Sequence, residues 1–145
     1  MVENTDQLFE QFKQYLSSEN LRLTSERKEI ARMIFKQEKQ FEAEELLFKL
    51  RNENKNVSRA TIYRTLELLV NGGLLQKLDF GDDYSLYQIS SGDPHHSHLY
   101  CRQCGKVIQF EDEKIRELQD QICEEYKFEP VEYSQKIYGY CEHCR

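Results

Sequence analysis

Residues 94–110, with the sequence PHHSHLYCRQCGKVIQF, bring three histidines and two cysteines into one short stretch of the chain. Imidazole nitrogens and thiolate sulfurs are the side-chain ligands that zinc and other transition metals prefer. A second pair of cysteines follows in CEHC, at residues 141–144. Residues of these types at this spacing predict metal binding, at one site or at two.

Four of the five cysteines form two CxxC pairs, which together supply the four sulfur ligands of a closed tetrahedral zinc site. Gly105 follows the first pair and favours the tight turn of a zinc knuckle. Such a site has no open coordination position, so its expected role is structural. A thioredoxin-like redox pair and simple reduced thiols are the alternatives. The expected zinc ligands are Cys101, Cys104, Cys141 and Cys144, whereas Cys123 is expected to be a small buried apolar residue.

The histidines of the stretch allow a different chemistry, because three protein ligands and one open position make a catalytic zinc site. These residues are His95, His96 and His98. No acidic residue lies at a general-base spacing from them, and the chain has no nucleophile motif. An enzyme such as a zinc hydrolase is therefore not expected. Histidines in a polar segment are also often merely solvated.

The chain has 145 residues and a formal net charge of −6, and 39% of its residues are hydrophobic. Residues 1–80 contain 13 basic and 13 acidic residues, whereas residues 81–145 contain 7 and 13, so the first half is the candidate binder of a polyanion. The apolar runs are too short to span a membrane, and the acidic N-terminus does not resemble a signal peptide. We expect a cytoplasmic protein, in a reducing compartment where cysteines bind metal rather than form disulfides.

The first half of the chain shows helical periodicity and then alternation. Apolar residues recur at helical spacing within residues 5–17, from Thr24 or Ser25 onward, within FEAEELLFKLRNE, and within VSRATIYRTLELLVNGG. LLQKLDF and YSLYQI then flank the turn-forming GDD at residues 81–83 and predict a β-hairpin. Helices followed by a hairpin predict a winged helix-turn-helix domain over residues 1–89.

The second half is smaller. Residues 90–97 are polar and predict a linker or hinge, and short strands are expected at 98–101 and 106–110. A helix at 112–127, with Ile115, Leu118, Ile122 and Tyr126 turned inward, precedes a strand at about 131–140. So small a unit needs a metal staple or a dimer interface. The predicted fold class is α+β, with an α/β dimerisation domain over residues 98–145.

The helix that begins after Ser58 is the candidate DNA reader. Its buried stripe is expected to be Ile62, Leu66, Leu69 and Val70, which leaves Arg59, Ala60, Tyr63, Arg64 and Glu67 exposed. In helix-turn-helix proteins the start of the second helix enters the major groove of double-stranded DNA. Arg22 and Arg27, near the start of an earlier helix, are expected to hold phosphates or reach a minor groove. A merely solvated helix face is the alternative.

The segments SRATIYRTLELLVNGGLL and HLYCRQCGKVIQF and the last CxxC pair resemble the ferric uptake regulator family over residues 8–145. The resemblance implies a homodimeric, metal-responsive transcriptional regulator, usually a repressor, that binds palindromic operators. It also implies that the four cysteines hold a structural zinc ion. Tyr63 and Arg64 match the base- and phosphate-contacting pair, with Arg59 and Thr61 beside them on the same helix, and Arg27 and Arg22 match basic residues of the DNA-binding surface.

The chain departs from the family at the metal-sensing positions. Where the resemblance implies histidine and carboxylate ligands around His96 and His98, the residues here are Gln40, Gln88 and Gln109. A neutral carboxamide oxygen is a much weaker donor than a carboxylate or an imidazole. Our hypothesis is that hydrogen bonds among these side chains replace a regulatory metal. The alternative is an ordinary iron, zinc or manganese sensor that uses His95, His96 and His98, with Asp93, Glu111 or Asp112 as substitute ligands.

A second metal site of the family is altered too. Its ligand positions correspond here to His95, Ser97, Arg116 and Tyr133, so one usual ligand type of four remains. Arg116 is expected to place a positive charge near this site. The acidic second half also leaves open a protein-interaction adaptor, which would lack the salt-dependent DNA affinity that a regulator should show.

Overall fold

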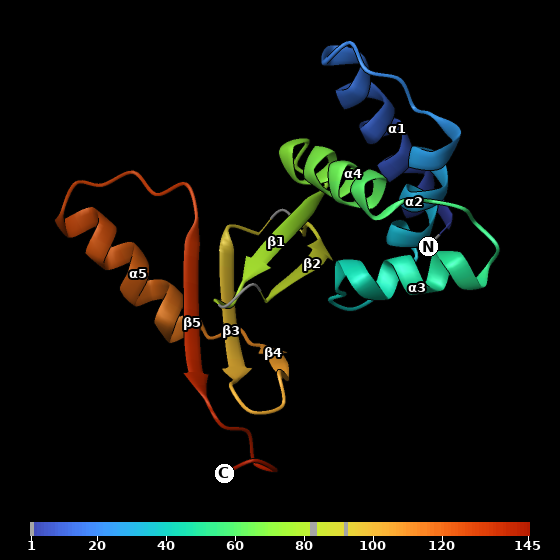
Figure 1. Ribbon diagram of the computed structural model, residues 1–145. Coiled ribbons are helices and arrows are strands. Elements are labelled where there is room, and N and C mark those ends of the chain that lie inside the picture. The colour runs from blue at the N-terminus through green and yellow to red at the C-terminus, as the bar shows by residue number, and fades with distance from the viewer. Residues whose placement is uncertain (1, 82–83, 92) are drawn as a thin grey trace. The chain divides into compact units, whose positions relative to one another are not determined.

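The computed structural model describes residues 2–81, 84–91 and 93–145, and it divides the chain into two compact units. We call Met1–Ser91 unit 1 and Gly92–Arg145 unit 2. Asp82 and Asp83 of the predicted turn, and Gly92 of the predicted linker, lie outside the described residues. None of the described helices is long and apolar enough to cross a membrane. Figure 1 shows the helices and strands of both units.

Unit 1 has the helices followed by a hairpin that the sequence predicts. The two strands pair antiparallel, with Gln76 opposite Gln88. Thr24 and Ser58 begin two of the helices, and each side chain accepts a hydrogen bond from the backbone amide three residues later. The elements are α1(Val2–Ser18), α2(Ser25–Phe35), α3(Ala43–Asn52), α4(Arg59–Asn71), β1(Leu75–Asp79) and β2(Ser85–Ile89).

One apolar core holds the helices of unit 1 together. Two to three residues from each helix are almost completely buried in it, among them Phe12, Leu16, Ile30, Ile34, Leu46, Leu50, Ile62, Leu66 and Leu69. α4 also packs closely against α1 at its end: a Cβ on Gly72 would lie 2.9 Å from the Tyr15 ring. The core therefore fixes the orientation of α4 within unit 1, which leaves its other face free to contact a partner.

The buried stripe of α4 differs from the prediction at two positions. Val70 is only half-buried, whereas Thr65 is 1% exposed. The Thr65 hydroxyl donates to the Thr61 carbonyl at 2.8 Å, and this bond satisfies the hydroxyl without a partner from another element. A polar residue can therefore lie on the buried face of this helix.

Unit 2 contains a three-stranded sheet and one helix. The strand order is β4-β3-β5, with β3 antiparallel to β4 and parallel to β5. Residues 95–97, which the sequence assigns to the linker, form the first part of β3 because they pair with residues 133–135 of β5. The elements are β3(His95–Cys101), β4(Val107–Gln109), α5(Glu113–Glu125) and β5(Tyr133–Gly139).

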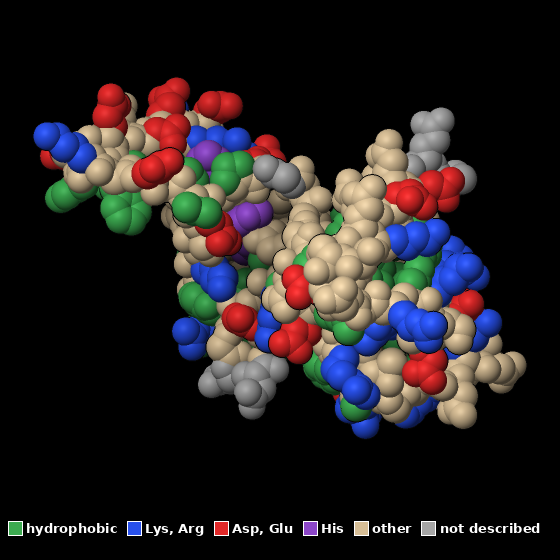
Figure 2. Space-filling view, turned by 90° about the horizontal axis from the view of Figure 1, so that it is seen from above, with side chains coloured by type: hydrophobic (Ala, Val, Ile, Leu, Met, Phe, Trp, Pro, Cys, Tyr) green, Lys and Arg blue, Asp and Glu red, His purple; other side chains and the backbone are tan. Residues whose placement is uncertain are grey.

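The predicted inward face of α5 is not covered within one chain. Leu118, Ile122 and Tyr126 are 57%, 55% and 75% exposed, and α5 has no buried residue, so this prediction is wrong for the single chain. The periodicity identifies an apolar face but not what covers it. Figure 2 shows uncovered apolar side chains beside the acidic side chains of α5 at the left of the view.

Candidate nucleic-acid interface and metal centre

The exposed face of α4 carries the residues that the sequence proposes as DNA contacts. Tyr63 is 44% exposed, and Arg64 is also exposed. The helical repeat places Arg64 opposite the buried Ile62 and Leu66, whereas Tyr63 lies on the flank of α4, between the two faces. The Arg64 Nε lies 3.4 Å from the Ala60 carbonyl, a long contact that leaves most guanidinium donors for another partner. The core thus leaves a ring and a cation exposed next to each other on α4.

Arg59 is engaged by Glu44, which is not among the predicted site residues. Its Nε and Nη2 donate to the two carboxylate oxygens of Glu44 in α3, at 2.8 and 3.0 Å. The hydrogen bond to Arg59 lowers the pKa of Glu44, and the same bond raises the pKa of Arg59. Two of the five guanidinium N–H donors of Arg59 are thus engaged by a carboxylate of the same chain.

Thr61 is half-buried at the start of α4. Its hydroxyl lies 2.8 Å from that of Ser58, whose oxygen accepts from the Thr61 amide at 3.1 Å. The Thr61 side chain therefore belongs to the helix cap, and its first effect is to fix where α4 begins.

Arg27 and Arg22 are connected through the loop between α1 and α2. The Arg27 Nη1 donates to the Arg22 carbonyl at 2.6 Å, while the Arg22 side chain is exposed. Arg27 is half-buried, so part of its role is to hold the shape of this loop. The bond leaves the guanidinium of Arg22 directed to solvent.

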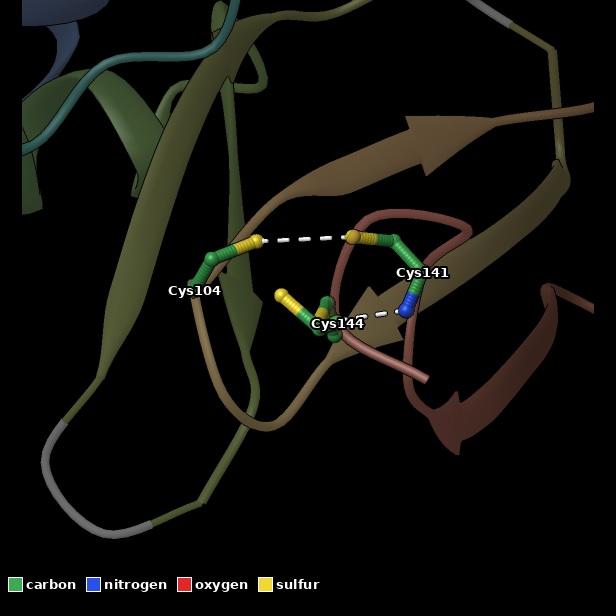
Figure 3. A group of neighbouring side chains, drawn as sticks. Cys104, Cys141 and Cys144 are labelled. Carbon is green, nitrogen blue, oxygen red and sulfur yellow. Dashed lines mark hydrogen bonds between the residues drawn. The ribbon is translucent and has the colours of Figure 1, made fainter.

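The four predicted zinc ligands come together in unit 2. The sulfurs of Cys101, Cys104, Cys141 and Cys144 all lie within 4.8 Å of one another. Cys104 Sγ and Cys141 Sγ are 3.8 Å apart, and Figure 3 shows them directed toward each other. Tetrahedral zinc with bonds of about 2.3 Å holds its sulfurs roughly 3.8 Å apart. The cysteines therefore fit a structural zinc ion.

The topology of the sheet explains this convergence. Because β3 and β5 are parallel, they end at the same edge, with Cys101 opposite Gly139. Gly105 turns the chain after the first pair with a φ of 77°, and its amide donates to the Cys101 carbonyl at 2.9 Å. After β5, the Cys144 amide donates to the Cys141 carbonyl at 2.9 Å. Two similar turns thus place two sulfurs each over the same sheet edge.

The thiols of this cluster ionise unequally. Backbone amides, first that of Cys104 and then that of Cys141, lower the pKa of Cys101 to about 6. Hydrogen bonding to Cys141 and then burial raise the pKa of Cys144 to about 12. The protein thus stabilises one thiolate by itself, and a cation is needed to hold four thiolates together.

The histidines do not converge in a comparable way. Among the described residues, the four cysteines are the group whose His, Cys, Asp or Glu ligand atoms converge. His98 is 1% exposed, and it lies opposite Gln109 of β4 and Lys136 of β5. Burial first, and then the charges of His96 and Lys136, lower the pKa of His98. His96 Nε2 lies 4.0 Å from Glu132.

Two of the three unusual glutamines contact each other. Gln40 Nε2 donates to Gln88 Oε1 at 3.2 Å, and Gln88 Nε2 donates to Gln76 Oε1 at 2.8 Å. Gln76 was not among the predicted site residues, although its place opposite Gln88 follows from the hairpin register. These hydrogen bonds connect Gln40 to the strands β2 and β1. Gln40 precedes Phe41, which pairs with Tyr87 of β2 in an isolated β-bridge.

The acids considered as substitute ligands are engaged by protein groups. Asp93 accepts a hydrogen bond from Arg116 at 2.7 Å, and Glu111 lies 3.8 Å from the same guanidinium. Asp112 caps α5 by accepting from the amides of Lys114 and Ile115. Each acid already has a structural partner, which reduces its availability to a metal ion.

The sequence of the chain matches a known family along most of its length. A profile described as the ferric uptake regulator family matches residues 18–138. The ferric uptake regulation protein of Campylobacter jejuni is 31% identical over 148 aligned residues, which cover 99% of this chain and 94% of that protein. The protein of the same name from Neisseria gonorrhoeae is 34% identical, and the match covers 90% of each chain.

Solved structures agree with this match. The Vibrio cholerae ferric uptake regulator is similar with a TM-score of 0.76 at 31% identity, over 89% of this chain and 98% of that one. The Francisella tularensis regulator with iron gives 0.78 at 29% identity, over 86% and 95%. The Helicobacter pylori regulator gives 0.85 at 24% identity, over 97% and 93%, and at that identity the likeness shows the fold alone.

Proposed function

The chain belongs to the ferric uptake regulator family, and from that premise we propose that it is a cytoplasmic repressor that binds palindromic operators as a dimer. Proteins of this family are transcriptional regulators rather than enzymes, so the zinc hydrolase alternative is excluded. We further propose that the protein carries a structural zinc ion and needs no regulatory metal ion to bind DNA.

The observation that carries the proposal is the exposed pair Tyr63 and Arg64 on a helix whose opposite face is fixed in the core. Arg64 is suited to guanine or phosphate, and the Tyr63 ring to a thymine methyl group. Arg22 lies on a loop held by Arg27 and supplies a second contact, to phosphate or the minor groove. Arg59 joins them once it leaves Glu44.

The uncovered apolar side chains of unit 2 support the proposal of a dimer. Unit 2 has further exposed apolar side chains on β5 and the segment before it, namely Val131, Ile137 and Tyr138. Exposed apolar surface on this scale is typical of a protein interface. A symmetric dimer would present two copies of α4, as a palindromic operator requires.

Metal independence is supported by the glutamines. The chain of amides from Gln40 through Gln88 to Gln76 satisfies these side chains with one another. A divalent ion would have to replace these bonds with weak carboxamide ligands. The alternative is a regulator that senses iron, zinc or manganese through His95, His96 and His98.

The test is a binding measurement on the full-length protein with random duplex DNA, from which bound sequences are selected. We expect an enriched palindrome, and affinity for it that falls steeply with salt. Binding should persist in a chelator too mild to remove thiolate-bound zinc, with about one zinc per chain by elemental analysis. Loss of binding with that chelator would favour the metal sensor, and no enriched sequence would favour the adaptor.

A matched variant sharpens the test of metal independence. Gln40→His together with Gln109→Glu restores the ligand types that the family resemblance implies at those positions. We expect this double variant to bind a second metal ion and to become chelator-sensitive. Gln121→Glu, which changes an exposed amide of unit 2 in the same way, should leave both properties unchanged. No gain of metal affinity in the double variant would contradict the proposed location of the site.

A further inference from the structure

The attachment of α5 to the sheet of unit 2 depends on polar side chains. α5 has no buried residue, so apolar packing within one chain contributes little to holding it. Arg116 Nη2 donates to Asp93 Oδ2 at 2.7 Å, and Tyr133 Oη donates to Asp120 Oδ1 at 2.6 Å. Arg116 and Asp120 are one helical turn apart and therefore lie on the same side of α5. Both bonds join that side to the start of a strand.

The same groups are connected on the strand side. Asp93 Oδ1 accepts from the His95 amide at 2.9 Å and lies 3.3 Å from His95 Nδ1. The His95 ring stacks on the Tyr133 ring, with centroids 4.2 Å apart and planes 5° from parallel. The five residues thus close a cycle through α5, which we call the polar ring: Asp93, His95, Arg116, Asp120 and Tyr133.

The polar ring contains its own cation. Arg116 stays protonated at any physiological pH, and its guanidinium lies against the Asp93 carboxylate and 3.8 Å from Glu111. The amide of His95 and then Arg116 lower the pKa of Asp93 to about 2, so this carboxylate is always charged. A divalent ion at Asp93 and His95 would lie close to the guanidinium and be repelled by it.

We propose that Arg116 is the resident cation of the polar ring: with Asp93 it positions the first residues of β3 against α5, and it excludes a divalent metal ion from His95. Asp93 and Pro94 directly precede β3, and the Pro94 carbonyl accepts a hydrogen bond from the Tyr133 amide at 2.8 Å. Movement of Asp93 would therefore disturb the pairing of β3 with β5. This inference rests on the proposed function in one respect: a regulator that needs no regulatory metal ion is expected to bind none at His95.

The first experiment asks whether Arg116 excludes metal. Zinc-loaded, full-length protein is titrated with cobalt(II), whose absorption spectrum distinguishes oxygen and nitrogen ligands from thiolates. We expect no second site in the wild type and one in Arg116→Glu, where a new carboxylate joins Asp93 and His95. Lys114→Glu makes the same charge change on an exposed residue of the same helix and should gain none. A second cobalt ion in the wild type, or none in Arg116→Glu, would overturn the proposal.

The second experiment asks whether Asp93 and Arg116 act as a pair, with milder changes that preserve the fold. Hydrogen exchange of the Tyr133 amide is measured in Asp93→Asn, Arg116→Gln and the double variant. We expect each single change to speed exchange about tenfold and the double change to add little, because both remove one charged hydrogen bond. Independent, multiplying effects would show that the two residues are not coupled and would contradict the proposal.

Neither measurement uses DNA. Operator binding by the wild-type protein is followed in parallel, so a failure of the proposed DNA binding and a failure of the polar ring give different results. Wild-type protein that binds no specific DNA but shows the expected cobalt and exchange behaviour would refute the first and support the second.

Discussion

Arg59, the first residue of α4, is held by Glu44 of α3 through two hydrogen bonds of 2.8 and 3.0 Å. Both side chains are more than half exposed, so the pair adds little to stability. Arg59 also lies at the start of the helix that we propose to read DNA. Under that proposal the Glu44 carboxylate neutralises a cation that could otherwise bind phosphate.

Glu44→Gln should therefore strengthen DNA binding. The change removes a negative charge from the interface and releases the Arg59 guanidinium, so we expect affinity to rise several-fold. The slope of log affinity against log salt should steepen by about one unit, as for one additional phosphate contact. Fluorescence anisotropy at several salt concentrations measures both. Glu45→Gln, an exposed neighbour in α3, is the control for loss of charge alone, and equal effects of the two changes would argue against the release of Arg59.

Arg64→Ala should weaken operator binding without weakening the fold. Arg64 is exposed and has one long contact of 3.4 Å within the chain, so thermal unfolding should not change. We expect a loss of about 1–3 kcal/mol in binding free energy at the preferred sequence, with reduced discrimination between bases. Arg51→Ala removes an exposed charge from α3 and serves as the comparison. An equal loss for both variants would mean that only the net charge of unit 1 matters.

Cys144→Ser should prevent zinc retention, since it removes one of four converging sulfurs. Unit 2 should then lose ordered structure, because structural zinc binding is coupled to folding. Elemental analysis and circular dichroism measure the two effects. Cys123→Ser is a closely matched control, since Cys123 is half-buried on α5 and lies outside the cluster. Zinc content that stays unchanged in Cys144→Ser would contradict the four-cysteine site.

His98 should make stability depend on pH. Its pKa is lowered from 6.5 by burial, so the unfolded chain takes up a proton below about pH 6.5 while the folded protein keeps His98 neutral. Stability is then complete above pH 6.5 and decreases as the pH falls below it. Urea unfolding of His98→Gln should show a flatter pH dependence than the wild type. His143→Gln, at an exposed position, should keep the wild-type dependence, and identical profiles for all three proteins would exclude His98 as the cause.

The sequence predicted those features that local chemistry determines. Ser58 begins α4 with a side-chain cap, and Gly72 ends it where the Tyr15 ring leaves no room for a Cβ. Serine before a helix and glycine after it are recognisable from the sequence alone. The cysteine pairs could be assigned because zinc demands four ligands at a known spacing. The ion pair between Glu44 and Arg59 could not be predicted from the sequence, because it depends on how α3 and α4 pack together. The α5 stripe failed for a related reason, because periodicity does not tell which surface covers Leu118.

The parallel pairing of β3 with β5 has a kinetic consequence. His95 can meet Tyr133 only after α5 and the segments around it have been made and brought back to β3. The helices of unit 1 form from contacts between neighbouring segments, and such contacts form faster than distant strand pairings. In pulsed hydrogen exchange during refolding, we therefore expect amides of α4 to become protected before those of β3 and β5. A newly synthesised chain would then pass through a monomeric stage in which unit 1 is folded and able to contact DNA, before unit 2 is able to dimerise.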